Sequence, residues 1–311
     1  MRIGVMVGEV LGPVTVDELI GQVRTAADHG FGTAWSAQLF GWDALTTLAI
    51  AGREVPGIRL GTAVVPTYPR HPLALASQAL TVQAATGNRL ILGVGLSHQL
   101  VIEGLFGYSY ARPARHMREY LTALAPLLRG ESVSFQGETL KAVGTVTVPG
   151  ATPPPLLVAA LGPVMLRLTG EIADGTVTWM TGPSTIAGHI VPTITAAAAA
   201  AGRPDPQIVA GLGVCVTDDR DGAHRRAAEQ FSLYGQLPSY RAMLDREGAH
   251  GPEDVVLIGD EASIRAQVGR LADAGTTELV GVPFGTAAER ARTLQLLGEL
   301  ASSGVAPGRL E

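Results

Sequence analysis

The sequence predicts an α/β fold, a (β/α)8 TIM barrel in which residues 1–311 form a single domain. Short apolar runs alternate with longer apolar-periodic segments along the chain, and this pattern is typical of alternating strands and helices. The stretch 58–99 shows it best, because apolar runs at 58–65 and 90–94 flank a periodic segment at 73–85. Strands that are apolar on both faces belong to parallel sheets covered by helices.

Four strands are expected in the first half of the chain, each followed by a helix. Thr15 and Glu18 have the spacing of a capping box at the start of the first helix, and Gly30 ends that helix. Pro56 and Gly57 end the second helix. The strands are predicted at 2–7, 33–36, 58–65 and 90–94, and the helices at 15–30, 42–53, 73–85 and 112–129.

An insertion at about 131–155 separates the fourth strand from the fifth. Residues 132–140 have the pattern of a small hairpin, and 141–155 is predicted to be a loop that ends in three consecutive prolines. The insertion is too short and too irregular to indicate a second domain.

The alternation resumes in the second half of the chain. Pro163 suits the first turn of a helix, and Asp260 and Gly275 suit the two ends of a later one. The strands are predicted at 156–160, 175–179, 208–216 and 278–282, and the helices at 164–173, 186–201, 221–234, 240–247, 261–274 and 286–302.

Composition excludes several classes of protein. The net charge of −5 and the lack of basic runs argue against nucleic-acid binding. Apolar runs all fall short of the roughly 20 residues that a membrane span needs. The one cysteine, Cys215, allows no disulfide framework and is expected to be a buried core thiol. These features, with no signal-peptide pattern at the start, favour the cytoplasm.

The expected strand ends carry few reactive side chains. Lys141, the only lysine, lies in the insertion, so an amine-dependent aldolase is not indicated. Glu9 and His98 are too few for a metal site, no metal ligands are predicted, and no carboxylate pair suits a glycosidase. This pattern favours an enzyme whose cofactor supplies the reactive atom. Gly162-Pro163 opens a helix and is a candidate site for an anion.

Four motifs, in order, resemble the bacterial luciferase-like monooxygenases, especially their branch of oxidoreductases that use the deazaflavin coenzyme F420. The resemblance extends over essentially the whole chain, and its specificity comes from the order of the motifs. They are the second-strand motif 30–35 with Gln38, the third-strand motif 61–66 with Arg70-His71-Pro72, the fourth-strand motif 89–95, and Gly162-Pro163 with Met165-Leu166 and 170–175.

The resemblance implies an F420-dependent oxidoreductase that transfers a hydride between the deazaflavin C5 and a small organic substrate. It also implies a non-proline cis peptide at Ala63-Val64, behind the cofactor ring, and a homodimer. Glu9 and Gln38 are the expected substrate contacts. The expected cofactor contacts are Thr62, Ala63, Val64, Ser97, His98, Leu161, Gly162, Pro163 and Trp179.

One departure from the family pattern leaves the acid–base chemistry open. Many relatives have an acidic residue and a histidine where this chain has Gln38 and Leu39. Gln38 and His98 are the candidate catalytic residues. Gln38 can only form hydrogen bonds, to the ring or the substrate, and His98 is the remaining titratable candidate, either for catalysis or for binding the cofactor tail. The alternatives are therefore an FMN-dependent monooxygenase, a flavin-binding protein without turnover and, third, a metal-dependent barrel hydrolase.

Overall fold

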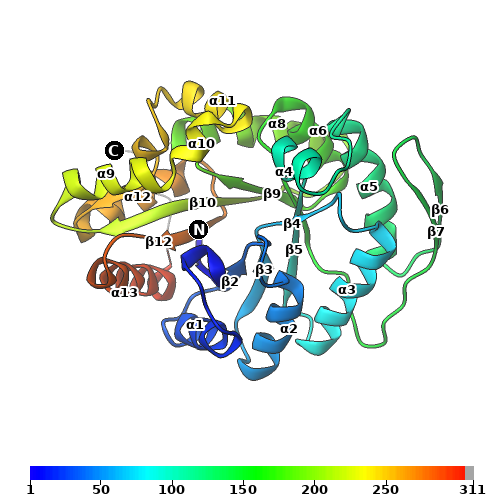
Figure 1. The fold of residues 1–311 in the computed structure, drawn as a ribbon, viewed down its shortest axis with the longest axis horizontal. Coiled ribbons are helices and arrows are strands. Elements are labelled where there is room, and N and C mark those ends of the chain that lie inside the picture. The colour runs from blue at the N-terminus through cyan, green and yellow to red at the C-terminus, as the bar shows by residue number, and fades with distance from the viewer. Residues whose placement is uncertain (305–311) are drawn as a thin grey trace.

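The computed structural model describes residues 1–304, so the last seven residues of the predicted domain lie outside the described range. Eight parallel strands close into a barrel, and helices surround it (Figure 1). This confirms the predicted fold. The barrel strands are β1 (Arg2–Val7), β2 (Thr33–Ser36), β3 with β4 (Arg59–Thr62 and Val65–Pro66), β5 (Leu90–Gly95), β8 (Leu156–Ala159), β9 (Gly175–Trp179), β10 (Gln207–Val216) and β12 (Glu278–Pro283).

The pairing β10–β9 closes the barrel, because β10 also pairs with β12 and β12 with β1. The register places Val5 of β1 between Ala34 of β2 and Gly281 of β12. A short extra strand, β11 (Leu257–Gly259), pairs with β10 outside the ring and was not predicted. Of the helices in residues 1–304, none combines the length and the apolar character needed to cross a bilayer.

The helices follow the strands in the expected order. The capping box of Thr15 and Glu18 is present, and the side chain of Asp260 caps its helix at Ser263 N. The main helices are α1 (Val16–Asp28), α2 (Ala44–Glu54), α3 (Pro72–Ala85), α4 (Gln99–Gly104), α5 (Pro113–Leu128), α6 (Pro163–Ile172), α8 (Val191–Ala200), α9 (Arg220–Gln230), α10 (Ser232–Gln236), α11 (Pro238–Glu247), α12 (Glu261–Asp273) and α13 (Ala287–Ser303).

Three predicted boundaries were wrong. The third strand is interrupted after Thr62 instead of running on to Val65. The second strand of the hairpin is β7 (Lys141–Gly144), which pairs with β6 (Val133–Gln136), so residues 141–144 are not loop. The helix expected from 186 to 201 begins earlier, as α7 (Pro183–Thr185), and contains a π-helical turn, η2 (Ile186–Ile190), before α8.

The barrel interior is filled by one ring and several aliphatic side chains. Trp35 is fully buried, as expected for a core residue, and Gly61 provides the space for it, because a Cβ atom there would lie 2.3 Å from the indole ring. The interior cluster consists of Met6, Trp35, Ile91, Leu157, Val177, Val209, Val280 and Val282. The interior is therefore a packed core. A ligand can bind only at one of the ends of the barrel.

A buried carboxylate closes the amino-terminal end of the barrel. Glu278 is 0% exposed and accepts hydrogen bonds from Trp35 Nε1 at 2.9 Å, Arg59 at 2.9 Å and Arg2 at 3.1 Å. These contacts join β12 to β1, β2 and β3. The Glu278 cluster therefore serves stability, since the strands of such barrels present their ligand sites at the opposite end.

Candidate functional site

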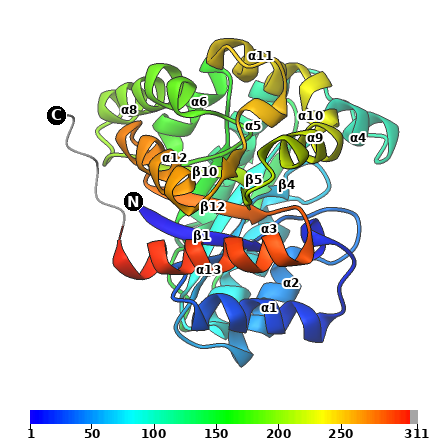
Figure 2. The same cartoon turned by 90° about the vertical axis from the view of Figure 1, so that its left-hand side faces the viewer.

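The carboxyl ends of the strands form an apolar mouth that continues the barrel core. Figure 2 shows α4 and α10 at this end of the molecule, at the right of the view. The partly exposed residues that pack on the interior cluster are Val10, Leu11, Ala37, Ala63, Val64 and Trp179. They follow four different strands, so the mouth has apolar walls on several sides, as expected for a site whose cofactor supplies the reactive atom.

The peptide Ala63-Val64 is cis, as predicted. It lies between β3 and β4, where the chain leaves the ladder and presents Val64 to the mouth. Gly95 of β5 leaves room for this arrangement, because a Cβ atom there would lie 2.6 Å from Val64 Cγ2 and 3.2 Å from Ala159 Cβ. Ala63 and Val64 therefore form an apolar surface supported from behind by β5.

Thr62 contributes differently from its neighbours. Its hydroxyl donates to Gly93 O and accepts from Gly93 N, both at 2.8 Å, and the residue is 0% exposed. Its side chain bridges β3 and β5 at the point where the two strands separate. A cofactor contact of Thr62 stays a prediction, and the side-chain hydroxyl is already paired.

Ser97 and His98 follow β5 and precede α4. Ser97 has a left-handed backbone with φ of 59°, and its carbonyl accepts from the Tyr110 hydroxyl at 3.2 Å. His98 is the N-cap of α4, and its side chain forms no capping hydrogen bond. Burial lowers the pKa of His98, which favours the neutral imidazole. The ring is therefore available to a ligand as a neutral hydrogen-bonding group.

A row of aromatic rings forms one wall beside His98. The ring centroid of Tyr240 lies 5.9 Å from that of His98 and 5.1 Å from that of Tyr234, and Tyr234 lies 5.7 Å from Trp179. Burial raises the pKa of Tyr234, and the nearby Trp179 indole partly offsets the rise. The Trp179 indole N–H is buried beside the Tyr234 hydroxyl, but within the described chain it forms no hydrogen bond of regular geometry.

The sequence interpretation missed Tyr234 and Tyr240. They lie on α10 and α11, in a segment that was predicted only as helices. The sequence did contain a signal for these residues. The chain has few aromatic residues, yet three of them, Phe231, Tyr234 and Tyr240, fall within ten positions.

A second unpredicted cluster lies behind the start of α3. The ring of His116 stacks on that of Tyr68 at 3.9 Å and 7°, and its Nε2 is 3.1 Å from Thr67 Oγ1. Burial lowers the pKa of His116 to about 4 and raises that of Tyr68 to about 12, so both are neutral near pH 7. The Tyr68 hydroxyl is buried without a hydrogen-bond partner in residues 1–304.

The turn between β8 and α6 contains Leu161, Gly162 and Pro163. Gly162 is the N-cap of α6 and Pro163 its first residue, and no side chain caps the free amides there. Open space surrounds Gly162, since a Cβ atom there would meet nothing within 4 Å. An uncapped helix start suits an anion. The carbonyl of Leu161 is bound by His189 Nε2 at 2.8 Å.

Glu9 and Gln38 organise the loop after β2. Glu9 accepts from Gly41 N at 3.3 Å. The Gln38 amide donates to Leu39 O and Trp42 O at 3.3 Å and accepts from Ala44 N at 2.8 Å. Both side chains are thus bonded to loop backbone, and their roles toward a substrate stay predictions.

The remaining titratable candidates are structural. His71 caps α3, with its Nδ1 accepting from Leu73 N, as its position before Pro72 indicated. Cys215 is buried, and burial raises the pKa of its thiol to about 11. Among residues 1–304, no three His, Cys, Asp or Glu side chains gather as metal ligands would.

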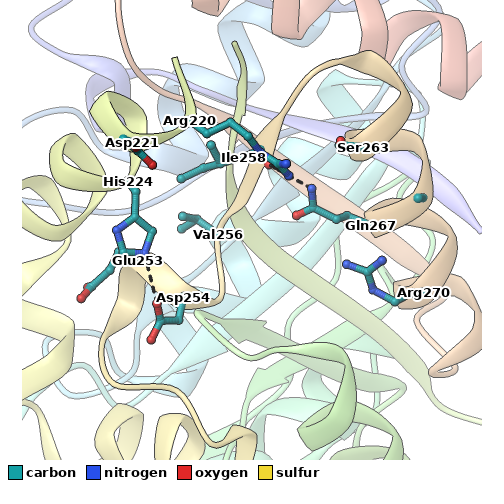
Figure 3. Close-up of a pocket in the computed structure, with 11 residues that line it drawn as sticks. Arg220, Asp221, His224, Glu253, Asp254, Val256, Ile258, Ser263, Gln267 and Arg270 are labelled. Atoms are coloured by element: carbon teal, nitrogen blue, oxygen red, sulfur yellow. Dashed lines mark hydrogen bonds and ion pairs between the residues drawn. The ribbon is translucent and has the colours of Figure 1, made fainter. Parts of the chain in front are cut away.

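A cavity of about 650 Å³ lies away from the mouth, between α9 and α12 (Figure 3). Several of its polar side chains bind each other or the backbone: His224 lies 3.1 Å from Asp254, and Arg220 and Gln267 donate to Ile258 O. These contacts cover the outer edge of β11. The cavity shares no lining residue with the predicted site.

Comparison with known proteins agrees with the ordered motifs. The family model for luciferase-like monooxygenases matches residues 1–298. The chain belongs to this family. A coenzyme F420-dependent oxidoreductase, so named, from Mycobacterium tuberculosis is 31% identical, over 88% of this chain and 92% of the relative. The 5,10-methylenetetrahydromethanopterin reductase of Methanolobus tindarius is 27% identical, over 89% and 93%.

Solved structures of this family share the fold over nearly the whole chain. An F420-dependent secondary alcohol dehydrogenase in complex with an F420–acetone adduct has a TM-score of 0.81 at 17% identity, covering 98% of both chains. A Baeyer–Villiger monooxygenase component from Pseudomonas putida, in complex with FMN, has a TM-score of 0.77 at 16% identity, covering 99% of both. The family model and the sequence relatives confirm the expected family and the expected oxidoreductase class, and the solved structures confirm the fold.

Proposed function

We propose that this member of the luciferase-like family is an F420-dependent oxidoreductase that transfers a hydride between the deazaflavin C5 and a small organic substrate. The observation that carries the proposal is the apolar surface of Ala63 and Val64 at the mouth, supported by Gly95. The relatives named for F420 favour that cofactor.

The residues present fit a deazaflavin. A planar ring needs a flat apolar surface, which the Ala63-Val64 bulge provides, and a polar partner, which the Trp179 N–H provides. The phosphate of the tail needs free amides, which the uncapped start of α6 provides. A bound deazaflavin would supply the carbon that gives or accepts the hydride, and the protein's part is orientation and exclusion of water.

The nature of the substrate is indicated by an apolar rim around the mouth. Of the eleven large apolar side chains exposed among the described residues, eight lie in the loop after β2, in and around α4 after β5, or at the start of α6 after β8, and a ninth, Leu233, lies on α10; Phe40 and Leu100 are 71% and 75% exposed. Exposed apolar side chains on segments that leave the strand ends are typical of a binding surface. The rim consists of Leu39, Phe40, Trp42, Leu100, Leu105, Phe106, Tyr108, Val164 and Leu233.

Cofactor choice is tested by titrating the purified protein with F420 and with FMN and following fluorescence quenching. We expect F420 to bind at least about tenfold more tightly, a difference of about 1.4 kcal/mol. Tight FMN binding without F420 binding would favour the monooxygenase alternative. Stopped-flow mixing of the protein that carries reduced F420 with ketones separates an enzyme from a binding protein. An enzyme would oxidise the cofactor, and a binding protein would not.

The rim predicts a neutral, largely apolar substrate. Along the series from 2-butanone to 2-octanone, we expect the KM of the F420-loaded enzyme to fall by about fourfold per methylene, since a buried methylene contributes about 0.8 kcal/mol. Phe40→Ser and Leu100→Ser should flatten this dependence. Val143→Ser, at an exposed apolar position in the β6–β7 hairpin, is the control. A KM independent of chain length in the unmodified enzyme would contradict the prediction.

The homodimer expected from the family also stays a prediction. The resemblance implies that two copies pair through the second and third helices, and Ile50 of α2 is an apolar side chain that is 43% exposed. The mass of the protein in solution decides this point.

A further inference from the structure

We propose that His189 is a positioning residue for the cofactor's phosphate, acting through the carbonyl of Leu161. The inference rests on the proposed function, because the start of α6 is the phosphate site only if a deazaflavin or flavin binds. It goes beyond that function by assigning a role to a side chain that lies in another βα unit of the barrel.

The contact itself is specific. His189 is only 9% exposed, and its Nε2 lies 2.8 Å from Leu161 O. A carbonyl oxygen only accepts, so Nε2 carries the proton and donates it. Leu161 immediately precedes Gly162, the N-cap of α6. The bond therefore orients the peptide that leads into the proposed phosphate site.

A proline explains why His189 can reach this carbonyl. Pro192 lacks an N–H, so an α-helix through this segment would leave the carbonyl four residues earlier unpaired. The chain instead forms the π turn η2, in which Val191 N donates to Ile186 O, five residues back. An extra residue in the turn changes the direction of the side chains before Pro192, and π turns of this kind recur at functional sites.

The turn is held at both ends, so it is a rigid support. Ile186 and Ile190 are fully buried. On the amino-terminal side, Glu247 accepts from Ser184 N and Thr185 N at 3.1 and 2.7 Å. α8 packs closely against α6, since a Cβ atom at Gly170 would lie 2.5 Å from Ile194 O. His189 thus transmits a fixed geometry to Leu161.

The consequence for a phosphate is electrostatic. Free amides at a helix start attract an anion, and a carbonyl oxygen turned toward the same anion would repel it. His189 engages the Leu161 oxygen and keeps that peptide in one orientation. Loss of the bond should therefore weaken binding of a phosphate-bearing cofactor and leave the ring contacts unchanged.

The test compares each variant with two probes: F420, and the same deazaflavin lacking the phosphate-bearing tail. We expect His189→Leu to weaken F420 at least tenfold and to leave the tail-free probe within twofold. His189→Gln, which keeps a donor at similar reach, should restore most of the affinity. His71→Leu is a matched control, because His71 Nε2 also lies 2.8 Å from a carbonyl, that of Lys141, away from α6.

Failure of this inference differs from failure of the proposed function. Wild-type protein that binds neither F420 nor FMN rejects the function. The role of His189 is overturned in two cases, both with wild-type protein that binds F420. In the first, His189→Leu binds F420 as well as the wild type does; in the second, it loses affinity for both probes equally. If His189→Leu does not fold, His189→Asn replaces it, because the Asn side chain is shorter than that of Gln and its donor does not reach the Leu161 carbonyl. Equal F420 affinities of the Asn and Gln variants would overturn the inference.

Discussion

Replacing Glu278 with alanine should lower the free energy of unfolding by about 3 kcal/mol, the lower end of the cost of breaking a buried ion pair. The carboxylate is fully buried at the base of the barrel and accepts from Trp35, Arg59 and Arg2. Its loss leaves the Trp35 N–H buried without a partner. The side chains of Arg59 and Arg2 are 33% and 49% exposed, so water compensates part of the hydrogen bonds that they lose.

Urea unfolding measures this effect. Glu278→Gln keeps the volume and an acceptor for Trp35, so we expect it to lose about half as much stability. Glu171→Ala is the control, because its ion pair with Arg118 is exposed and should contribute less than about 1 kcal/mol. A Glu278→Ala variant as stable as Glu171→Ala would show that the buried cluster is not what holds this end of the barrel.

Replacing Gly95 with alanine should abolish most of the cofactor affinity. The added Cβ atom would lie 2.6 Å from Val64 Cγ2, and Ala159 at 3.2 Å leaves it no room on the other side. Val64 must therefore move into the mouth, where the ring is proposed to bind. We expect at least a tenfold loss of F420 affinity, about 1.4 kcal/mol, and a stability loss of about 1–3 kcal/mol from overpacking.

Fluorescence titration and thermal unfolding of the same samples separate the two effects. Gly269→Ala is the matched control, because a Cβ atom there meets nothing within 4 Å in the helix α12. That variant should bind F420 normally and gain about 0.5–1 kcal/mol of stability. Normal F420 binding by Gly95→Ala would place the ring elsewhere than on Val64.

Local patterns predicted most of the fold. Strands 2–7, 33–36 and 175–179 were predicted to the residue, because each is a short run bounded by turn residues. The caps at Thr15 and Asp260 were likewise predicted from spacing alone. The cis peptide followed from the family resemblance, since no composition or periodicity distinguishes Ala63-Val64 from an ordinary strand.

The candidate site was predictable only in part. The strand ends that lead to the mouth were identified in order, and they include Val64, Ser97, His98 and Trp179. Tyr234 and Tyr240 were missed because they lie on helices after β10, and only the folded chain brings them beside Trp179 and His98. The π turn was missed because Pro192 predicts only that an α-helix would leave the Gly188 carbonyl unpaired, and does not say whether the chain ends, kinks or adds a residue there.

The amino-acid order by itself determined the alternation of strands and helices, their caps and the apolar character of the strand ends, because these depend on neighbours within a few positions. The tertiary structure alone decided which side chains are already occupied. Gln38 binds its own loop, Thr62 binds Gly93, and His189 binds Leu161 from another βα unit. The partners of Thr62 and His189 come from other βα units and meet them only when the barrel folds, so spacing along the chain carries no record of those contacts.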